Sequence, residues 1–190
     1  MPENVAPTVT DVVINGAGPS VTPDERRQRS MVTSIVVRFS EPVRFEEGVM
    51  SMVLIGRTAT DGRPVGSPVS FNFAPSADRT SMTIIFVGED VVGGSIPDGR
   101  YRLDILMSNV IDDSGLSGSG TRSETFHRLF GDADGNGAVD GRDLLQFRRS
   151  LGSTEGGTRY RSWFDIDADG DVSPTDLAQA RRRYSLRLLD

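Results

Sequence analysis

Two twelve-residue segments carry oxygen-bearing side chains at the same spacing. Loop 1 is Asp132–Asp143 (DADGNGAVDGRD), and loop 2, 33 residues further on, is Asp165–Asp176 (DIDADGDVSPTD). Each has an oxygen donor at positions 1, 3, 5, 9 and 12 and glycine at position 6. This is the ligand spacing of a calcium-binding loop, whose oxygens surround a hard cation. Two such loops in register favour calcium over the alternative, a pair of solvated acidic turns.

The sequence predicts two Ca²⁺ per chain. In loop 1 the expected ligands are Asp132, Asp134, Asn136, the carbonyl of Ala138, Asp140 through a water, and Asp143. In loop 2 they are Asp165, Asp167, Asp169, the carbonyl of Asp171, Ser173 and Asp176. Magnesium retains more water, and zinc or copper would require histidine or cysteine. We expect Gly137 and Gly170 at turns with positive φ, and Val139 and Val172 to join the two loops by a short β bridge.

The surroundings of the loops resemble a known family. Position 12 is Asp in both loops, and no amphipathic helix precedes loop 1. From Leu129 to Tyr184 the chain resembles a bacterial type I dockerin, a calcium-binding module that docks onto cohesin domains. The resemblance is carried by Phe130–Gly137, Asp143-Leu144-Leu145, Asp176-Leu177-Ala178, Gln146 and Gln179, Arg148-Arg149 and Arg181-Arg182.

The resemblance implies a cohesin partner and two candidate recognition faces, on helices expected to start near Gly141 and Pro174. The implied contact residues are Gly141, Arg142, Arg148, Arg149, Pro174, Thr175, Arg181 and Arg182. Because Gly-Arg and Pro-Thr are unlike each other, the two faces are not expected to be interchangeable, and the second helix is favoured. The alternative is that the arginines form only a solvated helix face.

The composition of the 190-residue chain limits its partners and its location. The formal net charge of −6 disfavours nucleic acid and anionic membrane surfaces. There is no cysteine, and no apolar run approaches the roughly 18 residues of a membrane helix. The start, Met1-Pro2-Glu3-Asn4, lacks a signal-peptide pattern. The polar start leads us to expect a C-terminal piece of a longer secreted protein. The resemblance to dockerins implies a bacterial protein, extracellular or at the cell surface, whose parent acts in polysaccharide catabolism.

The first two-thirds of the chain read as short strands separated by Gly, Pro, Ser and Asp. The apolar positions alternate or form short β-rich runs at 10–14, 35–39, 49–55, 69–73, 82–87, 101–105 and 121–126. The patterns around Val36–Val43 and Asn109–Gly115 resemble bacterial Ig-like domains. The sequence therefore predicts an all-β, Ig-like antiparallel sandwich over residues 1–128. A small α dockerin-like domain with two EF-hand-type calcium loops is predicted over residues 129–190. The junction lacks Gly and Pro between Phe126 and Phe130, so the two should pack together.

No catalytic constellation is found, so the chain is expected not to be an enzyme. The single histidine, His127, is interpreted as a junction residue, and Trp163, Phe164, Met50, Met52, Met82 and Met107 as core. The expected function is attachment of a parent protein to a cohesin, with the Ig-like domain as spacer. Two alternatives stay open: the calcium loops only staple a structural C-terminal module, or the Ig-like domain binds carbohydrate. A calcium sensor is disfavoured because sensors open a groove between paired helices.

Overall fold

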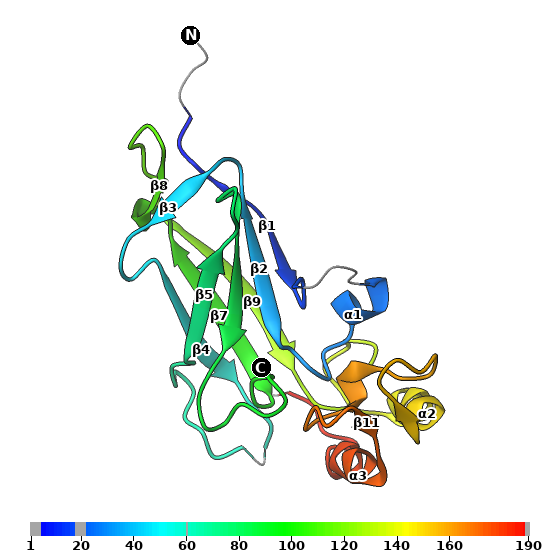
Figure 1. Ribbon diagram of the computed structural model, residues 1–190. Helices are drawn as coiled ribbons and strands as arrows, with labels where there is room; N and C mark the ends of the chain where they lie inside the picture. Colours follow the sequence, from blue (N-terminus) through cyan, green and yellow to red (C-terminus); the bar gives the residue numbers. More distant parts are fainter. Residues whose placement is uncertain (1–4, 18–21, 60, 189–190) are drawn as a thin grey trace.

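The computed structural model describes residues 5–17, 22–59 and 61–188. The polar start of the chain, Met1-Pro2-Glu3-Asn4, lies outside the described residues. What is described is mostly β, with three α-helices, and Figure 1 shows the β part above a small helical part. No helix among the described residues has the length and apolar character needed to cross a bilayer.

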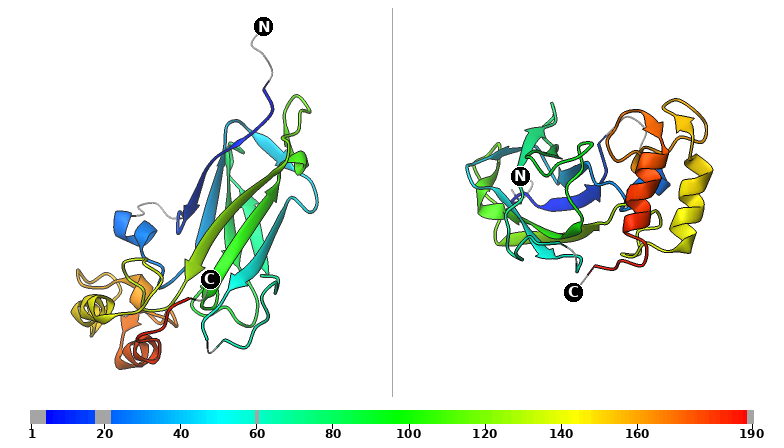
Figure 2. Two further views of the ribbon diagram at one scale, coloured as in Figure 1. Left: turned by 180° about the vertical axis from the view of Figure 1, so that it is seen from behind. Right: turned by 90° about the horizontal axis from the view of Figure 1, so that it is seen from below.

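Nine strands occupy the first part of the described chain, and all their ladders are antiparallel. They are β1 (Val9–Ile14), β2 (Ser34–Phe39), β3 (Val43–Phe45), β4 (Met50–Gly56), β5 (Phe71–Pro75), β6 (Ser81–Phe86), β7 (Gly99–Leu106), β8 (Val110–Asp112) and β9 (Thr121–Arg128). One sheet has the order β1-β2-β6-β5, a second β4-β7-β9, and β3 pairs with β8. The two larger sheets face each other as a sandwich (Figure 2).

The period-two pattern explains why these segments form the sandwich. Along β7, Tyr101, Leu103 and Ile105 are fully buried, while the residues between them are partly or fully exposed. Ile35 and Val37 of β2 and Met82 and Ile84 of β6 come from the facing sheet and join the same core. Because side chains alternate across a strand, each sheet presents one apolar face, and the two faces close on each other.

Several sequence expectations for the sandwich are confirmed and others need correction. The strand expected at 69–73 is β5, Phe71–Pro75, and the short β3–β8 ladder was not predicted. A one-and-a-half-turn helix, α1 (Pro23–Arg27), lies where no helix was expected. The reason is local: the Thr22 hydroxyl accepts from the Glu25 amide while the Glu25 carboxylate accepts from the Thr22 amide, a capping box with Pro23 at the first helical position.

The C-terminal part is built around a second apolar cluster, to which Met31 of the first part also belongs. Its helices are α2 (Gly141–Ser150) and α3 (Pro174–Arg182), which lie side by side in Figure 2, with the 3₁₀ turn η2 (Ser162–Phe164) and the two-residue strands β10 (Ser153–Thr154) and β11 (Asp171–Val172). Phe130, Phe147, Phe164 and Trp163 form the centre of this cluster. The expectation that Trp163 and Phe164 are core residues is therefore confirmed.

The predicted β bridge between the two loops is wrong. Val139 of loop 1 pairs with the segment after α3, donating its amide to Leu186 and accepting from Ser185. Val172 of loop 2 pairs with Ser153 in the segment after α2. Each loop is thus closed by the chain that leaves the other repeat's helix. The physical reason is that this exchange satisfies the edge amides of both loops with backbone already next to them.

One carboxylate of the sandwich joins the two parts of the chain. Asp98, just before β7, accepts from Arg128 Nη1 at 2.6 Å and from Arg183 Nε at 2.5 Å. It also accepts from the Phe130 amide at 2.7 Å. The guanidiniums of Arg128 and Arg183 lie over the Phe130 ring, 5.5 and 5.6 Å from its centroid. The predicted packing of the two parts on each other is confirmed.

Candidate functional site

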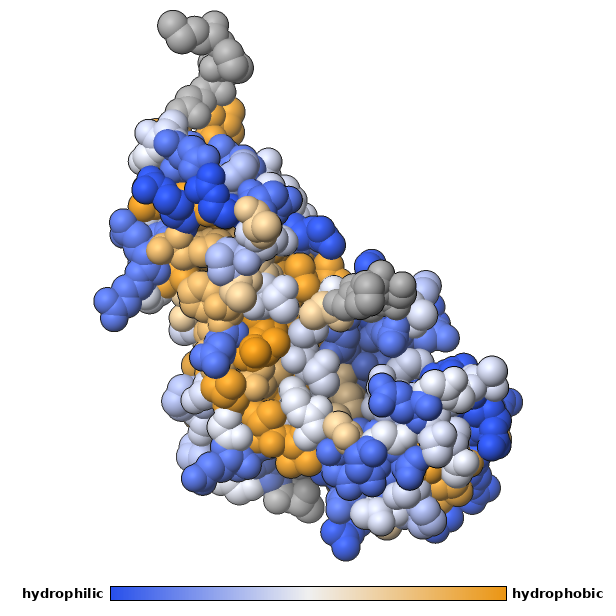
Figure 3. All heavy atoms as spheres, viewed as in Figure 1, coloured by the Kyte–Doolittle hydropathy of each residue, from blue (hydrophilic) through white to orange (hydrophobic). Residues whose placement is uncertain are grey.

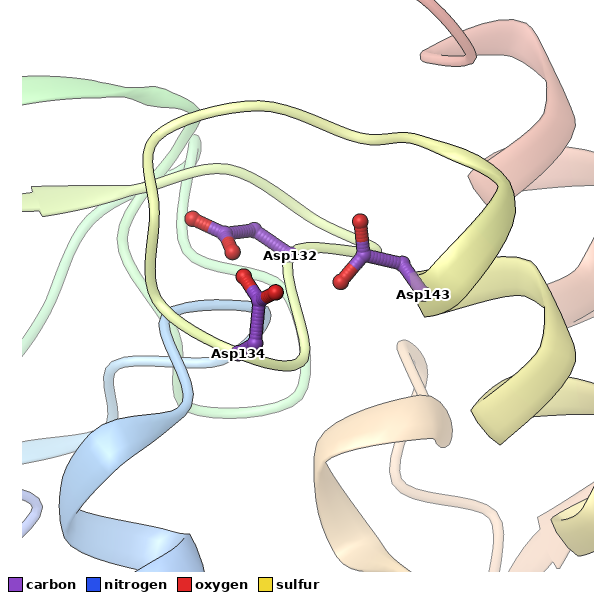
Figure 4. A group of neighbouring side chains, drawn as sticks. All are labelled: Asp132, Asp134 and Asp143. Atoms are coloured by element: carbon purple, nitrogen blue, oxygen red, sulfur yellow. The ribbon is translucent and has the colours of Figure 1, made fainter.

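Loop 1 brings three carboxylates together. Asp132 and Asp134 in the loop and Asp143 in the first turn of α2 point toward one another (Figure 4), with one oxygen of each within 4.8 Å of the others. Asp132 and Asp143 are fully buried. Asp132 Oδ1 accepts from the amides of positions 4 and 5 at 2.7 and 3.0 Å, and its Oδ2 accepts from the Gly137 amide at 2.9 Å. The loop backbone therefore wraps around its first carboxylate.

Loop 2 repeats part of this network around a different set of carboxylates, those of positions 1, 3 and 5. Asp165, Asp167 and Asp169 each offer an oxygen within 4.8 Å of the others. Asp165 Oδ2 accepts from the Gly170 amide at 2.9 Å, as Asp132 does from Gly137. In both loops the amide of position 7 donates to the side chain of position 5, at 2.9 Å each time. The repeated spacing in the sequence thus corresponds to a repeated hydrogen-bond pattern.

The turn glycines adopt the expected backbone. Gly137 has φ +82° and Gly170 has φ +92°, so the expectation of positive φ at position 6 is confirmed. Position 4 was not expected to need it, yet Gly135 has φ +76° and Ala168 has φ +56°. Glycine is favoured there in loop 1, and loop 2 carries the more costly alanine.

The residues at positions 9 and 12 have a second role that the sequence analysis missed. Asp140 and Ser173 are the N-caps of α2 and α3, and Asp143 and Asp176 complete a capping box in each. Each carboxylate of position 12 accepts from the amide of position 2 on one oxygen and of position 9 on the other, at 2.8–2.9 Å. The signal was present as a cap residue followed three positions later by a carboxylate.

Without a cation the carboxylates repel one another. Burial raises the pKa of Asp143 above its usual range, and the charges of Asp134 and Asp132 raise it further. Hydrogen bonds from two backbone amides lower the pKa but do not outweigh these effects. Desolvation likewise raises the pKa of Asp167, with contributions from the charges of Asp169 and Asp176. Crowding of this kind is relieved by a bound divalent cation.

The donor set suits calcium. Every donor that the two loops offer is a carboxylate, amide, hydroxyl or carbonyl oxygen, with no nitrogen or sulfur. Calcium takes about six to eight such oxygens, more than a magnesium site usually supplies from protein. Among the described residues, the groups of three or more acidic side chains close enough to hold an ion are those in loops 1 and 2.

The sandwich contacts both loops. In loop 1 the carbonyl of Asp132 accepts a hydrogen bond from the Arg29 amide at 3.0 Å. Gly135 packs so closely against the Arg27 backbone that a Cβ there would lie 2.2 Å from the Arg27 carbonyl oxygen. Loop 2 places the carbonyl of Ile166 2.4 Å from where a Cβ of Gly93 would be. Backbone contacts of this kind hold each loop against the segment that precedes β2 or β7.

The residues expected to bind a partner lie on the outer surface of the two helices. The helices start at Gly141 and Pro174, as expected. All eight candidates are exposed: Gly141, Arg142, Arg148, Arg149, Pro174, Thr175, Arg181 and Arg182. None of the ion pairs found among the described residues involves the arginine pair of α2 (Arg148, Arg149) or that of α3 (Arg181, Arg182). In α2 this surface also carries Leu145, 53% exposed.

The family comparison agrees with this duplicated loop-and-helix unit. Residues 130–183 match the family model of the dockerin type I domain. A type I dockerin domain is therefore present in the C-terminal part, within the range from Leu129 to Tyr184 over which the sequence resembles that family. Dockerin domains are non-catalytic and generally bind calcium. No curated protein matches the chain.

Solved structures give weaker similarities. PcoC, a methionine-rich copper resistance protein from Escherichia coli, is 24% identical over 52% of this chain and 83% of its own, with a TM-score of 0.38. CopC from Methylosinus trichosporium is 13% identical over 64% and 94%, with a TM-score of 0.35. A mutant type II cohesin–X–dockerin complex from Acetivibrio cellulolyticus is 13% identical over 72% and 80%, with a TM-score of 0.29. Scores this low establish neither a common fold nor a common ligand.

Proposed function

We propose that the chain is a non-catalytic attachment module whose dockerin domain binds two Ca²⁺ and docks onto a cohesin domain. The observation that carries this proposal is the dockerin match over two loop-and-helix units whose outer helix faces are exposed. The parent protein is then a secreted bacterial protein, and polysaccharide degradation is the setting that the family suggests.

A further candidate, a carbohydrate-binding sandwich, lacks a row of exposed aromatic side chains. Among described strand residues the large exposed aromatic is Phe73, 40% exposed.

Calcium would be held by the ligands expected from the sequence. In loop 1 the carboxylates of Asp132, Asp134 and Asp143 converge, and in loop 2 those of Asp165, Asp167 and Asp169 do. Asn136, the carbonyl of Ala138 and Asp140 complete the first set, and the carbonyl of Asp171, Ser173 and Asp176 the second. Because position 12 also caps the helix, ion binding and the start of each helix are linked. Calorimetric titration with calcium, which should give a stoichiometry near two, tests this step.

Docking would use one of two pseudo-equivalent helix faces. Arg148 and Arg181 occupy the same place in the repeat, as do Arg149 and Arg182, and the guanidinium forks suit carboxylates or carbonyls on a partner. Leu145 in α2 corresponds to Ala178 in α3, so the two faces differ in apolar content as well as in their first turns. Because the two faces differ, a single docking mode is favoured. The pair Pro174-Thr175 at the start of α3 favours that helix as the docking face.

The sandwich would act as an Ig-like spacer. Residues 1–128 and 129–190 would form two domains, each built around an apolar cluster, with Met31 of the first reaching into the cluster of the second. The contacts of Asp98 with the Phe130 amide and with Arg183 hold the two together. Figure 3 shows apolar surface over the sandwich and a mainly polar surface over the dockerin domain. A polar docking face can stay exposed to water until a partner covers it.

A purely structural role for calcium is the second candidate. It is favoured by one observation, the close backbone contact of both loops with the sandwich at Gly135 and Gly93. Binding assays with cohesin domains from the source organism, in saturating calcium and in chelator, separate the two. The structural role predicts calcium-dependent stability without cohesin binding, and the attachment role predicts both.

A further inference from the structure

The duplication begins before the loops, inside the last strand of the sandwich. Shifting the chain by 33 residues aligns Arg128 with Arg161 and Phe130 with Trp163. The guanidinium of Arg128 lies over the Phe130 ring at 5.5 Å from its centroid, and that of Arg161 lies over the Trp163 ring at 5.8 Å. The same contact thus recurs upstream of both loops, and in the first copy it starts from β9.

A ring donor stands one position further upstream in each copy. His127 Nε2 lies 2.8 Å from Oδ2 of Asp132, and the Tyr160 hydroxyl lies 2.8 Å from Oδ2 of Asp165. Each ring precedes its aspartate by five residues. In both copies the same oxygen also accepts from the amide of the position 6 glycine, at 2.9 Å. An ionised carboxylate only accepts, so the ring nitrogen or hydroxyl donates.

The shared feature of these two side chains is the donor, not the shape. An imidazole and a phenol differ in size, so a purely packing role would not select both for one position of the repeat. Two donors on Oδ2 fix the rotation of the carboxylate and leave Oδ1 to amides of the loop itself. Outer-shell hydrogen bonds of this kind orient metal ligands and typically change metal affinity by about 10–100-fold.

We infer that His127 and Tyr160 are positioning residues that orient the first calcium ligand of loops 1 and 2. This inference rests on the proposed calcium binding. Its consequence is an asymmetry between the loops: the donor for loop 2 comes from within the dockerin domain, whereas the donor for loop 1 comes from β9 of the sandwich. Calcium binding by loop 1 therefore depends on a residue outside the range that matches the dockerin family, 130–183.

The test uses full-length variants that keep one loop each. In an Asp132→Ala background, where loop 2 alone binds, Tyr160→Phe removes the hydroxyl and keeps the ring. Calorimetric titration with calcium chloride should show an affinity about tenfold or more below that of the background. Tyr160→His, which supplies the donor of the other repeat, should restore most of it. Tyr184→Phe, at a tyrosine that is 51% exposed, is the matched control and should have no effect.

The reciprocal test uses an Asp165→Ala background and His127→Phe, with the same expected loss at loop 1. If both Phe variants bind calcium within twofold of their backgrounds, the inference is overturned while the calcium assignment stands. The inference is also overturned if Tyr160→His binds calcium as weakly as Tyr160→Phe, because the loss of affinity is then not due to the missing hydrogen-bond donor. If the unaltered chain binds no calcium, the proposed function fails and this inference fails with it.

Discussion

Replacing Asp98 by asparagine should destabilise the packing of the dockerin domain on the sandwich. The carboxylate accepts from Arg128, Arg183 and the Phe130 amide, and its own side chain is 14% exposed. Asparagine keeps the shape but removes the charge, and it turns an NH₂ group toward a guanidinium. The Arg128 side chain, only 4% exposed, then keeps a buried charge without its counter-ion, whereas Arg183, at 20%, can reach solvent more easily. Breaking a buried ion pair costs about 3–5 kcal/mol, and we expect the free energy of unfolding to fall by about 3 kcal/mol.

The chain contains its own reporter for this experiment. Its single tryptophan, Trp163, is buried in the dockerin core, so urea unfolding followed by tryptophan fluorescence in saturating calcium reports that domain. Asp113→Asn is the matched control, because Asp113 receives two hydrogen bonds from Arg79 but the pair is 60% and 40% exposed. The control should leave unfolding unchanged within error. Equal unfolding of Asp98→Asn and Asp113→Asn would refute the role of Asp98.

The pH dependence gives an independent check on Asp98. Burial would raise the pKa of its carboxyl, but Arg128 and Arg183 outweigh this and hold the pKa below its usual value. A carboxylate whose pKa is lowered in the folded state stabilises above its unfolded pKa of about 4 and loses that contribution as the pH falls through the folded pKa. The stability difference between the native chain and Asp98→Asn should therefore be constant at neutral pH and shrink below about pH 4.

Three further predictions concern calcium and docking. Asp132→Ala and Asp165→Ala should each lower the calcium stoichiometry from near two to near one. Each should also lower the melting temperature followed by tryptophan fluorescence, while the sandwich transition followed by circular dichroism stays in place. Equal loss of both transitions would contradict this. Replacing both arginines of α3 by glutamate should weaken cohesin binding by about 2–5 kcal/mol, whereas the same change in the α2 pair should have little effect. If neither change weakens cohesin binding, the arginines are a solvated face. Gly135→Ala should weaken calcium binding by loop 1 because its Cβ would meet the Arg27 carbonyl, whereas Gly156→Ala, with similar φ and open space, should not.

The sequence was most informative where the structure depends on local spacing. The two loops, the turn glycines at position 6 and the helix starts at Gly141 and Pro174 all follow from residues within about a dozen positions of one another. The strands of the sandwich followed from period-two alternation, as along β7. Local capping signals were present but missed at α1, where Thr22 and Glu25 form a capping box around a helix too short to show periodicity.

Contacts between distant residues could not be predicted from spacing. Asp98 meets Arg183 across 85 positions, and Val139 pairs with the segment after α3 rather than with Val172. Such pairings depend on how the two repeats are placed against each other and against the sandwich, which no local pattern specifies. His127 is intermediate: aligning the two repeats places it opposite Tyr160, but only the structure shows that both rings reach the first aspartate of a loop.

Calcium-dependent binding to a cohesin domain is the property on which the proposed function rests. The direct measurement is calorimetry between the full chain and cohesin domains from the source organism, first in saturating calcium and then in excess chelator. One cohesin should bind per chain in calcium, and binding should disappear in chelator. Two calcium ions bound with no affinity for any of the cohesins would contradict the attachment function and leave calcium with the structural role alone.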